Sequence, residues 1–225
     1  MPTESAPAPR TDPGETRRLV VMDVDSTLIT AEVVELLAAH AGSRTEVAEI
    51  TERAMRGELD FAESLRARVA TLAGLGESVF AEVLAEVELS PGATDLLAEL
   101  DRRGWPVALV SGGFVEVVRP LAARLGITRF RANALEVSGG VLTGRVRGEI
   151  VDRAVKARTL REFAADLGLP LERTLAIGDG ANDLDMLATA GFGVAFNAKP
   201  VVCAQADAVV RGRLDGVLDL PAFAV

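Results

Sequence analysis

The chain has 225 residues, a formal net charge of −9 and a single cysteine. A chain of this length buries roughly 70% of its unfolded surface, so a full hydrophobic core needs no disulfide. One cysteine excludes an intramolecular disulfide, and the N-terminus lacks the apolar stretch of a secretory signal, so we expect a reducing compartment, the cytoplasm. The negative charge argues against nucleic acid as a partner, and no run of about 18 apolar residues predicts a membrane span. The oligomeric state stays open.

Residues 1–17 are predicted to form a disordered tail, because they hold four of the ten prolines and mixed charges. The folded part begins with the apolar run 19–22, which ends at Asp23 and is typical of a buried parallel strand. Residues 32–89 show helical spacing almost throughout, with breaks at glycines. This block interrupts the strand–helix alternation directly after the first strand, so we interpret it as an inserted helical cap.

Strands and helices alternate after residue 89. We expect helices at 91–103 (with Ser90 as cap), 114–125, 151–167 and 183–190 and from 200, strands at 106–110, 174–177, 193–196 and 208–210, and a β-hairpin at 130–146. This order predicts an α/β fold: a Rossmann-like three-layer core with a mainly parallel sheet, a helical cap after the first strand and a small β-hairpin flap. The core domain would comprise 18–31 and 90–225, and the cap 32–89.

Polar clusters follow three of the predicted strands, at Asp23, Ser111 and Asp179. In open α/β sheets ligands bind beyond the carboxyl ends of the strands, so these clusters should meet in one pocket. Asp25 lies on the same side of the chain as Asp23, and Asp183 follows in the next helical turn. Four carboxylates repel one another unless a cation joins them, and oxygen ligands without histidine or thiolate favour Mg²⁺ over zinc.

The same strand ends carry groups that suit a phosphate. Ser111 offers a hydroxyl, and the backbone N–H groups of Gly112 and Gly113 can form an anion nest. Lys156 is one of only two lysines among 24 basic residues, the other being Lys199, and supplies a compact positive charge. These parts predict phosphoryl transfer, with Asp23 as nucleophile and Asp25 as general acid and base.

Over about residues 19–220 the chain resembles the haloacid dehalogenase superfamily of phosphatases. The resemblance is carried by Asp23-Val24-Asp25-Ser26-Thr27, Ser111-Gly112-Gly113, Lys156, Gly178-Asp179-Gly180-Ala181-Asn182-Asp183 and Ala198-Lys199-Pro200. It implies that Mg²⁺ is held by the Asp23 and Asp179 carboxylates and the Asp25 backbone carbonyl, with Asp183 ordering a metal-bound water and Lys156. It also implies that Ser111, Gly112 and Lys156 bind the phosphoryl oxygens and that Asn182 binds near the phosphate or structures its loop.

The resemblance extends to the cap, where it assigns the substrate contacts. Glu32 would receive a substrate ammonium and Arg68 a carboxylate, although Arg66 is close enough in sequence to be confused with Arg68. Met55 and Phe61 would shield the closed site. A guanidinium fork suits a carboxylate, and an apolar lid excludes water from the reaction.

The implied function is Mg²⁺-dependent hydrolysis of O-phospho-L-serine to L-serine and phosphate through an aspartyl phosphate on Asp23, the last step of L-serine biosynthesis. An alternative is a related phosphatase or phosphotransferase for another small phosphomonoester, such as phosphoethanolamine or a nucleotide. A receiver-type phosphoacceptor domain is disfavoured because such domains are shorter and have no helical cap. A catalytically silent binding module is disfavoured because Asp23, Asp25, Lys156 and Asp179 are all present.

Overall fold

The computed structural model describes residues 17–55 and 58–224, so the predicted tail lies outside the described residues except for Arg17. Within these ranges, seven strands form one sheet in the order β4-β3-β2-β1-β5-β6-β7. All neighbouring pairs are parallel except β3 and β4, which are antiparallel. The strands are β1 (Leu19–Met22), β2 (Val107–Phe114), β3 (Arg129–Ser138), β4 (Val141–Arg147), β5 (Thr174–Gly178), β6 (Phe192–Phe196) and β7 (Ala208–Val210). The predicted mainly parallel sheet is confirmed.

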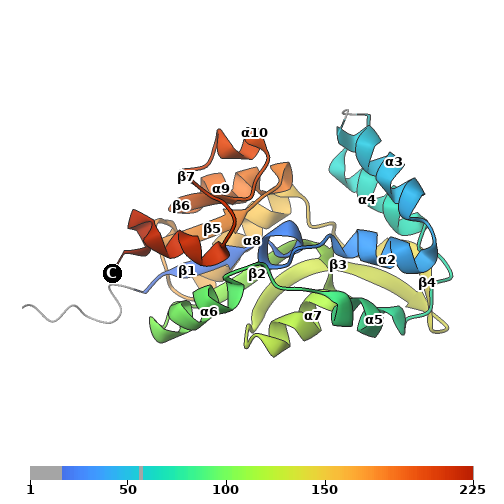
Figure 1. The fold of residues 1–225 in the computed structure, drawn as a ribbon, viewed down its shortest axis with the longest axis horizontal. Helices are drawn as coiled ribbons and strands as arrows, with labels where there is room; N and C mark the ends of the chain where they lie inside the picture. The colour runs from blue at the N-terminus through green and yellow to red at the C-terminus, as the bar shows by residue number, and fades with distance from the viewer. Residues whose placement is uncertain (1–16, 56–57, 225) are drawn as a thin grey trace, which may run out of the picture.

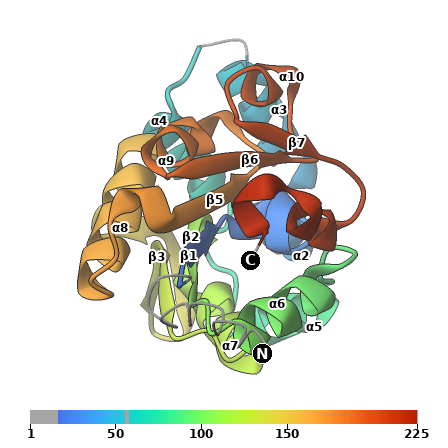
Figure 2. The same ribbon diagram turned by 90° about the vertical axis from the view of Figure 1, so that its left-hand side faces the viewer.

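Helices cover both faces of this sheet (Figures 1 and 2). Strand residues alternate between the faces, so Val20 and Met22 of β1 belong to one hydrophobic cluster and Leu19 and Val21 to the other. The first cluster is completed by α6 (Ala93–Arg102) and α7 (Val115–Arg124), and the second by α8 (Arg153–Asp166), α9 (Leu184–Thr189) and α10 (Pro200–Cys203). The three-layer core is therefore as expected. Short 3₁₀ helices lie at 171–173, 181–183, 214–219 and 221–223.

Four helices separate β1 from β2 in the sequence: α2 (Val33–Ala41), α3 (Arg44–Met55), α4 (Phe61–Ala70) and α5 (Val79–Glu86). Figure 1 shows α3 and α4 projecting beyond the sheet, although α4 contacts strand β4. Helix α5 packs against α7, and α2 packs against α3 and α5. This is the helical insertion that the sequence predicts. The division into a core of 18–31 and 90–225 and a cap of 32–89 remains our proposal.

The β3–β4 hairpin turns at Gly139 and Gly140, whose φ angles of 61° and 79° suit a two-residue hairpin turn. Its outer strand is bound to the connection between α4 and α5. Gly74 N donates to Leu142 O at 2.8 Å, and Leu142 N donates to Leu75 O at 2.8 Å. The flap and the cap therefore share backbone hydrogen bonds, although about 65 residues separate them in sequence.

Two expected boundaries are wrong. Helix α6 begins at Ala93 rather than Pro91, with Gly92 at φ 81° as its N-cap. The residues before it bind other segments, because Ser90 N donates to Leu28 O at 2.9 Å and Leu214 N donates to Pro91 O at 2.7 Å. Strand β2 does not end at Val110 but continues to Phe114, with a register shift against β3 after Val110. Gly112 and Gly113, which lie in this part of β2, allow the bulge.

No helix among the described residues is both long and apolar enough to cross a bilayer.

Candidate active site

Asp23 follows β1 directly and lies at the carboxyl edge of the sheet. Its backbone N donates to Ile177 O of β5 at 3.0 Å, which joins two strand ends. Its Oδ1 accepts a hydrogen bond from Val24 N at 2.7 Å, and its Oδ2 lies 2.7 Å from Lys156 Nζ. Burial, supported by the negative charge of Asp183, raises the pKa of Asp23 well above its usual value despite the nearby ammonium.

Lys156 projects from α8 into this cluster, and its side chain is fully buried. Its Nζ donates to Asp183 Oδ1 at 2.7 Å. Burial acts to lower the pKa of Lys156, but the charges of Asp183 and Asp23 outweigh it, so the pKa is raised overall and the ammonium stays protonated. Asp183 Oδ2 accepts from Asp179 N at 3.1 Å and Gly180 N at 3.0 Å, so protein donors occupy both oxygens of this carboxylate.

Asp25 lies in the turn Val24–Leu28 and is held by two donors. Its Oδ1 accepts from Val33 N at 3.0 Å, and its Oδ2 accepts from Ser111 Oγ at 3.2 Å. Burial, followed by the negative charge of Glu32, raises the pKa of Asp25 to about 7. A carboxyl group with such a pKa can both donate and accept a proton near neutral pH.

Asp179 follows β5 and completes the group of strand-end carboxylates. Its Oδ1 accepts from Thr27 Oγ1 at 3.1 Å. Burial, then the charges of Asp183 and Glu32, raise its pKa to about 6. Carboxylate oxygens of Asp23, Asp179 and Asp183 all lie within 4.8 Å of one another. Asp23 and Asp179 line the cavity described below, whereas Asp183 is fully buried and does not, so Asp23 and Asp179 are the carboxylates best placed for a hard divalent cation.

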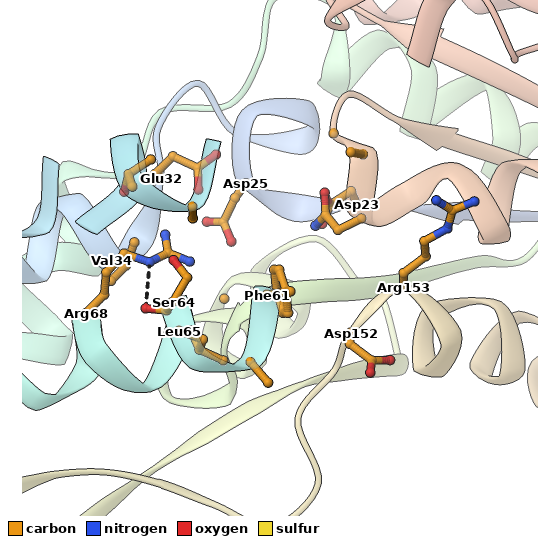
Figure 3. Close-up of a pocket in the computed structure, with 18 of the residues that line it drawn as sticks. Asp23, Asp25, Glu32, Val34, Phe61, Ser64, Leu65, Arg68, Asp152 and Arg153 are labelled. Carbon is orange, nitrogen blue, oxygen red and sulfur yellow. Dashed lines mark hydrogen bonds between the residues drawn. The ribbon is translucent and has the colours of Figure 1, made fainter. Parts of the chain in front are cut away.

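A cavity of about 1030 Å³ opens between these strand ends and the cap (Figure 3). Figure 3 shows Glu32 and Arg68 on the same side of this cavity, beyond Asp25 as seen from Asp23. The sequence-predicted residues that line it are Asp23, Asp25, Glu32, Phe61, Arg68, Gly112, Asp179 and Asn182. Ser111, Lys156 and Asp183 are fully buried behind its wall. The predicted convergence of three strand ends is thus present in the structure.

Phe61 begins α4, whose start is fixed by a capping box between Asp60 and Glu63. A Cβ placed on Gly112 would lie 3.2 Å from Phe61 Cζ and 3.7 Å from Asn182 Nδ2. The aromatic ring of the cap therefore lies directly over the glycine of the core, with Asn182 beside it. Met55 is the last residue of α3, and its side chain lies outside the described residues.

The two arginines of α4, Arg66 and Arg68, differ in whether they face the cavity. Arg66 is exposed and does not line the cavity, whereas Arg68 does. Arg68 Nε donates to Ser64 O at 3.3 Å. Burial lowers the pKa of Arg68, and the negative charges of Glu32, Asp25 and Glu35 act against this lowering. Of the two α4 arginines, Arg68 is therefore the one that faces the carboxylates.

Asn133 of β3 is a site residue that the sequence did not indicate. Its Nδ2 donates to Gly112 O at 2.7 Å, and its Oδ1 accepts from Val151 N at 2.8 Å. The buried amide thus fixes the Gly112 loop against the start of α8. Asn133 lies in the hairpin, outside the sequence motifs described above. The one feature of the sequence that could have indicated it is that it is a polar residue within a predicted strand.

Other cavity residues have weaker sequence signals. Arg153 and Asp185 form an ion pair at 2.6 Å on the cavity wall. Lys199, which stands out because lysine is rare in this chain, is exposed at the N-cap position of α10 and also lines the cavity.

A family model for haloacid dehalogenase-like hydrolases matches residues 20–188. The chain is 63% identical over 205 residues to a phosphoserine phosphatase of Streptomyces coelicolor, with 91% of this chain and 50% of that protein covered. It is 56% identical to a phosphoserine phosphatase of Streptococcus thermophilus, with 85% and 89% covered. Among solved structures, a phospho-aspartyl intermediate analogue of phosphoserine phosphatase superposes with a TM-score of 0.85 at 38% identity, covering 91% and 98%. The chain spans about half the length of the Streptomyces relative.

Proposed function

The chain belongs to the haloacid dehalogenase-like hydrolase family, and on that basis we propose that it hydrolyses O-phospho-L-serine to L-serine and phosphate in the cytoplasm, as the last step of L-serine biosynthesis. The main observation in support of this substrate is that Glu32 and Arg68 line the same cavity as Asp23 and Asp25. The substrate ammonium needs an anionic partner and the substrate carboxylate a cationic one, and Glu32 and Arg68 provide them in this cavity. The relatives named phosphoserine phosphatase support the same substrate.

In the proposed reaction, an Asp23 oxygen attacks phosphorus and the bond between phosphorus and the serine oxygen breaks. Asp25 donates its proton to the departing serine oxygen. Asp25 then accepts a proton from a water molecule, whose oxygen attacks phosphorus. The bond between phosphorus and the Asp23 oxygen breaks, which releases phosphate and restores the Asp23 carboxylate. The Asp25 pKa of about 7 supports both proton transfers.

Three groups of the core would bind the phosphoryl oxygens in this proposal: Ser111, Gly112 and Lys156. Lys156 already contacts Asp23 at 2.7 Å, so its charge is placed beside the group that carries the phosphoryl. Ser111 is fully buried and hydrogen bonded to Asp25, so it would have to turn its hydroxyl to reach a phosphoryl oxygen. Asn182 lines the cavity beside Gly112 and would bind near the phosphate.

Mg²⁺ fits the acidic group because its donors are oxygens and the carboxyl groups at Asp23 and Asp179 have raised pKa values. The Asp23 and Asp179 carboxylates and the Asp25 backbone carbonyl would hold it. Asp183, which is fully buried and does not line the cavity, would order the surroundings rather than bind the ion directly. When bound, the ion supplies positive charge that offsets repulsion between the carboxylates and the phosphate.

The cap would select the substrate. Glu32 would bind the serine ammonium and Arg68 the serine carboxylate, by charge-assisted hydrogen bonds. Met55 and Phe61 would exclude water from the closed site, a role that the position of Phe61 over Gly112 supports.

The test is phosphate release from L-phosphoserine, phosphoethanolamine, phosphothreonine and a nucleoside monophosphate, each with Mg²⁺ and with EDTA. We expect metal-dependent preference for L-phosphoserine. The Arg68→Ala variant should lose its preference for L-phosphoserine over phosphoethanolamine, which has no carboxylate. Arg66→Ala is the matched control, because Arg66 is exposed on the same helix outside the cavity. If Arg68→Ala keeps the preference for L-phosphoserine over phosphoethanolamine, Arg68 does not bind the substrate carboxylate, and a substrate without a carboxylate becomes the better proposal.

A further inference from the structure

Ser26 has an unusual backbone conformation. Among the described non-glycine residues, positive φ angles occur at Ser26, with φ 55°, and at Asn197, with φ 46°. Asparagine tolerates this left-handed region better than most residues, and Asn197 Oδ1 accepts a hydrogen bond from Gly212 N at 2.8 Å. Serine has less intrinsic preference for it, and glycine would adopt it without strain. The strain at Ser26 therefore points to a use for its side chain.

The Ser26 hydroxyl is used in a bond to the cap. Ser26 Oγ donates to Glu32 Oε1 at 2.7 Å, and both residues line the cavity. Ser26 N also donates to Ala31 O at 3.3 Å, so the loop returns on itself and brings Glu32 back toward Ser26. Glycine at this position would relieve the strain but would remove the hydroxyl. Alanine would keep the strain and also remove the hydroxyl.

This bond decides which groups remain available in the cavity. Glu32 and Arg68 have opposite charges, and the Glu32 charge acts on the Arg68 guanidinium. Even so, these two described side chains form no ion pair with each other, and Glu32 is bonded to Ser26 instead. A glutamate free to rotate about its three side-chain bonds would be drawn to the arginine, and each would then neutralise the other.

We propose that Ser26 is a positioning residue that holds Glu32 away from Arg68, so that both charges stay available for the two charged ends of the substrate. The inference rests on the proposed function, because it takes a substrate ammonium and a substrate carboxylate as the partners of Glu32 and Arg68. It adds to that function the group that keeps the two recognition residues apart.

The experiment measures kcat and KM for L-phosphoserine and for ethyl phosphate, which has the ester but neither charged end. The variants are Ser26→Gly and Ser26→Ala. We expect KM for L-phosphoserine to rise about tenfold in both, as for the loss of one hydrogen bond to a charged group, with a smaller change in kcat. The kcat/KM for ethyl phosphate should be unchanged. Ser26→Gly should melt at or above the wild-type temperature, because it removes the backbone strain.

Two further variants separate positioning from a general structural effect. Ser43→Ala is the matched control, since Ser43 Oγ also makes a cap hydrogen bond, to Thr71 Oγ1 at 3.0 Å, but does not line the cavity. It should leave KM unchanged. The double variant Ser26→Gly/Glu32→Gln should have the same KM as Glu32→Gln alone, because Ser26 acts through Glu32.

The inference is overturned if both Ser26 variants keep the wild-type KM, if ethyl phosphate is affected equally, or if the two substitutions add independently. If the wild-type protein hydrolyses L-phosphoserine selectively and the Ser26 variants keep its KM, this inference is wrong and the proposed function stands. A wild-type protein with no such selectivity overturns both.

Discussion

Lys156 Nζ lies 2.7 Å from Asp23 Oδ2, and the two side chains are 0% and 5% exposed. A buried ammonium and a buried carboxylate each lose their hydration, and only their mutual attraction and further hydrogen bonds repay that loss. Here Asp183 is the second partner of the same ammonium. Lys156 is therefore the buried cation that balances two acidic groups at the centre of the site.

Replacing Lys156 with Met should destabilise the protein by about 3–5 kcal/mol, because it leaves Asp23 and Asp183 buried without their counter-charge. Urea unfolding followed by circular dichroism measures this. Lys199→Met is the control, since Lys199 is exposed, and it should change the free energy of unfolding by less than about 0.5 kcal/mol. Equal unfolding midpoints for the two variants would contradict the balancing role of Lys156.

Replacing Asp23 with Asn should reduce phosphate release to near background, because an amide cannot attack phosphorus as a carboxylate does. Radiolabelled L-phosphoserine should label the wild-type protein in a rapid acid quench and should not label the variant. The melting temperature should not fall, since burial disfavours the charged form of Asp23. A variant that turns over at the wild-type rate would exclude Asp23 as the nucleophile.

Divalent cation binding should depend on pH through Asp179. Its pKa of about 6 lies above the usual 3.8 because of burial and the charges of Asp183 and Glu32. A cation binds the ionised form, so Mg²⁺ affinity should weaken as the pH falls below about 6. Titration calorimetry in two buffers of different ionisation enthalpy should detect proton release on binding.

The same raised pKa contributes to the pH dependence of the stability of the metal-free protein. A carboxyl group with a raised folded pKa favours folding at low pH, and this contribution is lost as the pH rises from 3.8 through about 6. Mg²⁺ should offset that loss above pH 6, and Asp179→Asn should flatten the profile in this window. A melting temperature that does not respond to Mg²⁺ at pH 7.5 would count against the metal site.

Gly144 of β4 allows the flap to contact α4 closely. Its φ is +78°, and an added Cβ would lie 3.0 Å from Ala73 Cβ and 3.2 Å from Ala70 O. Gly148 has φ +82° with nothing within 4 Å, so it is a matched control. Both alanine variants should lose about 1–2 kcal/mol from backbone strain. Gly144→Ala should lose more and also raise KM for L-phosphoserine, because α4 carries Phe61 and Arg68. Identical losses in the two variants would show that the contact is unimportant.

The fold and the centre of the site were predictable from the sequence because their signals are local. An apolar run followed by an acidic residue marks a buried strand and its end, as at Met22 and Asp23. Parallel strands place their carboxyl ends at one edge, so Asp23 and Asp179 had to meet once the topology was recognised. The start of α6 was not predictable, since it depends on hydrogen bonds from Ser90 N to Leu28 O and from Leu214 N to Pro91 O, which join segments distant in sequence.

By itself, the sequence determined the order of strands, helices and motifs along the chain, the helical insertion and the kinds of chemical group in the pocket. These could be predicted because periodicity and strand ends are properties of neighbouring residues. Only the tertiary structure decided that Arg68 rather than Arg66 lines the cavity, that Asn133 holds Gly112, and that Ser26 binds Glu32. Each of these depends on how one segment packs against another. The packing between segments sets the direction of each side chain, together with its burial and backbone strain. A local sequence pattern contains no information about that packing.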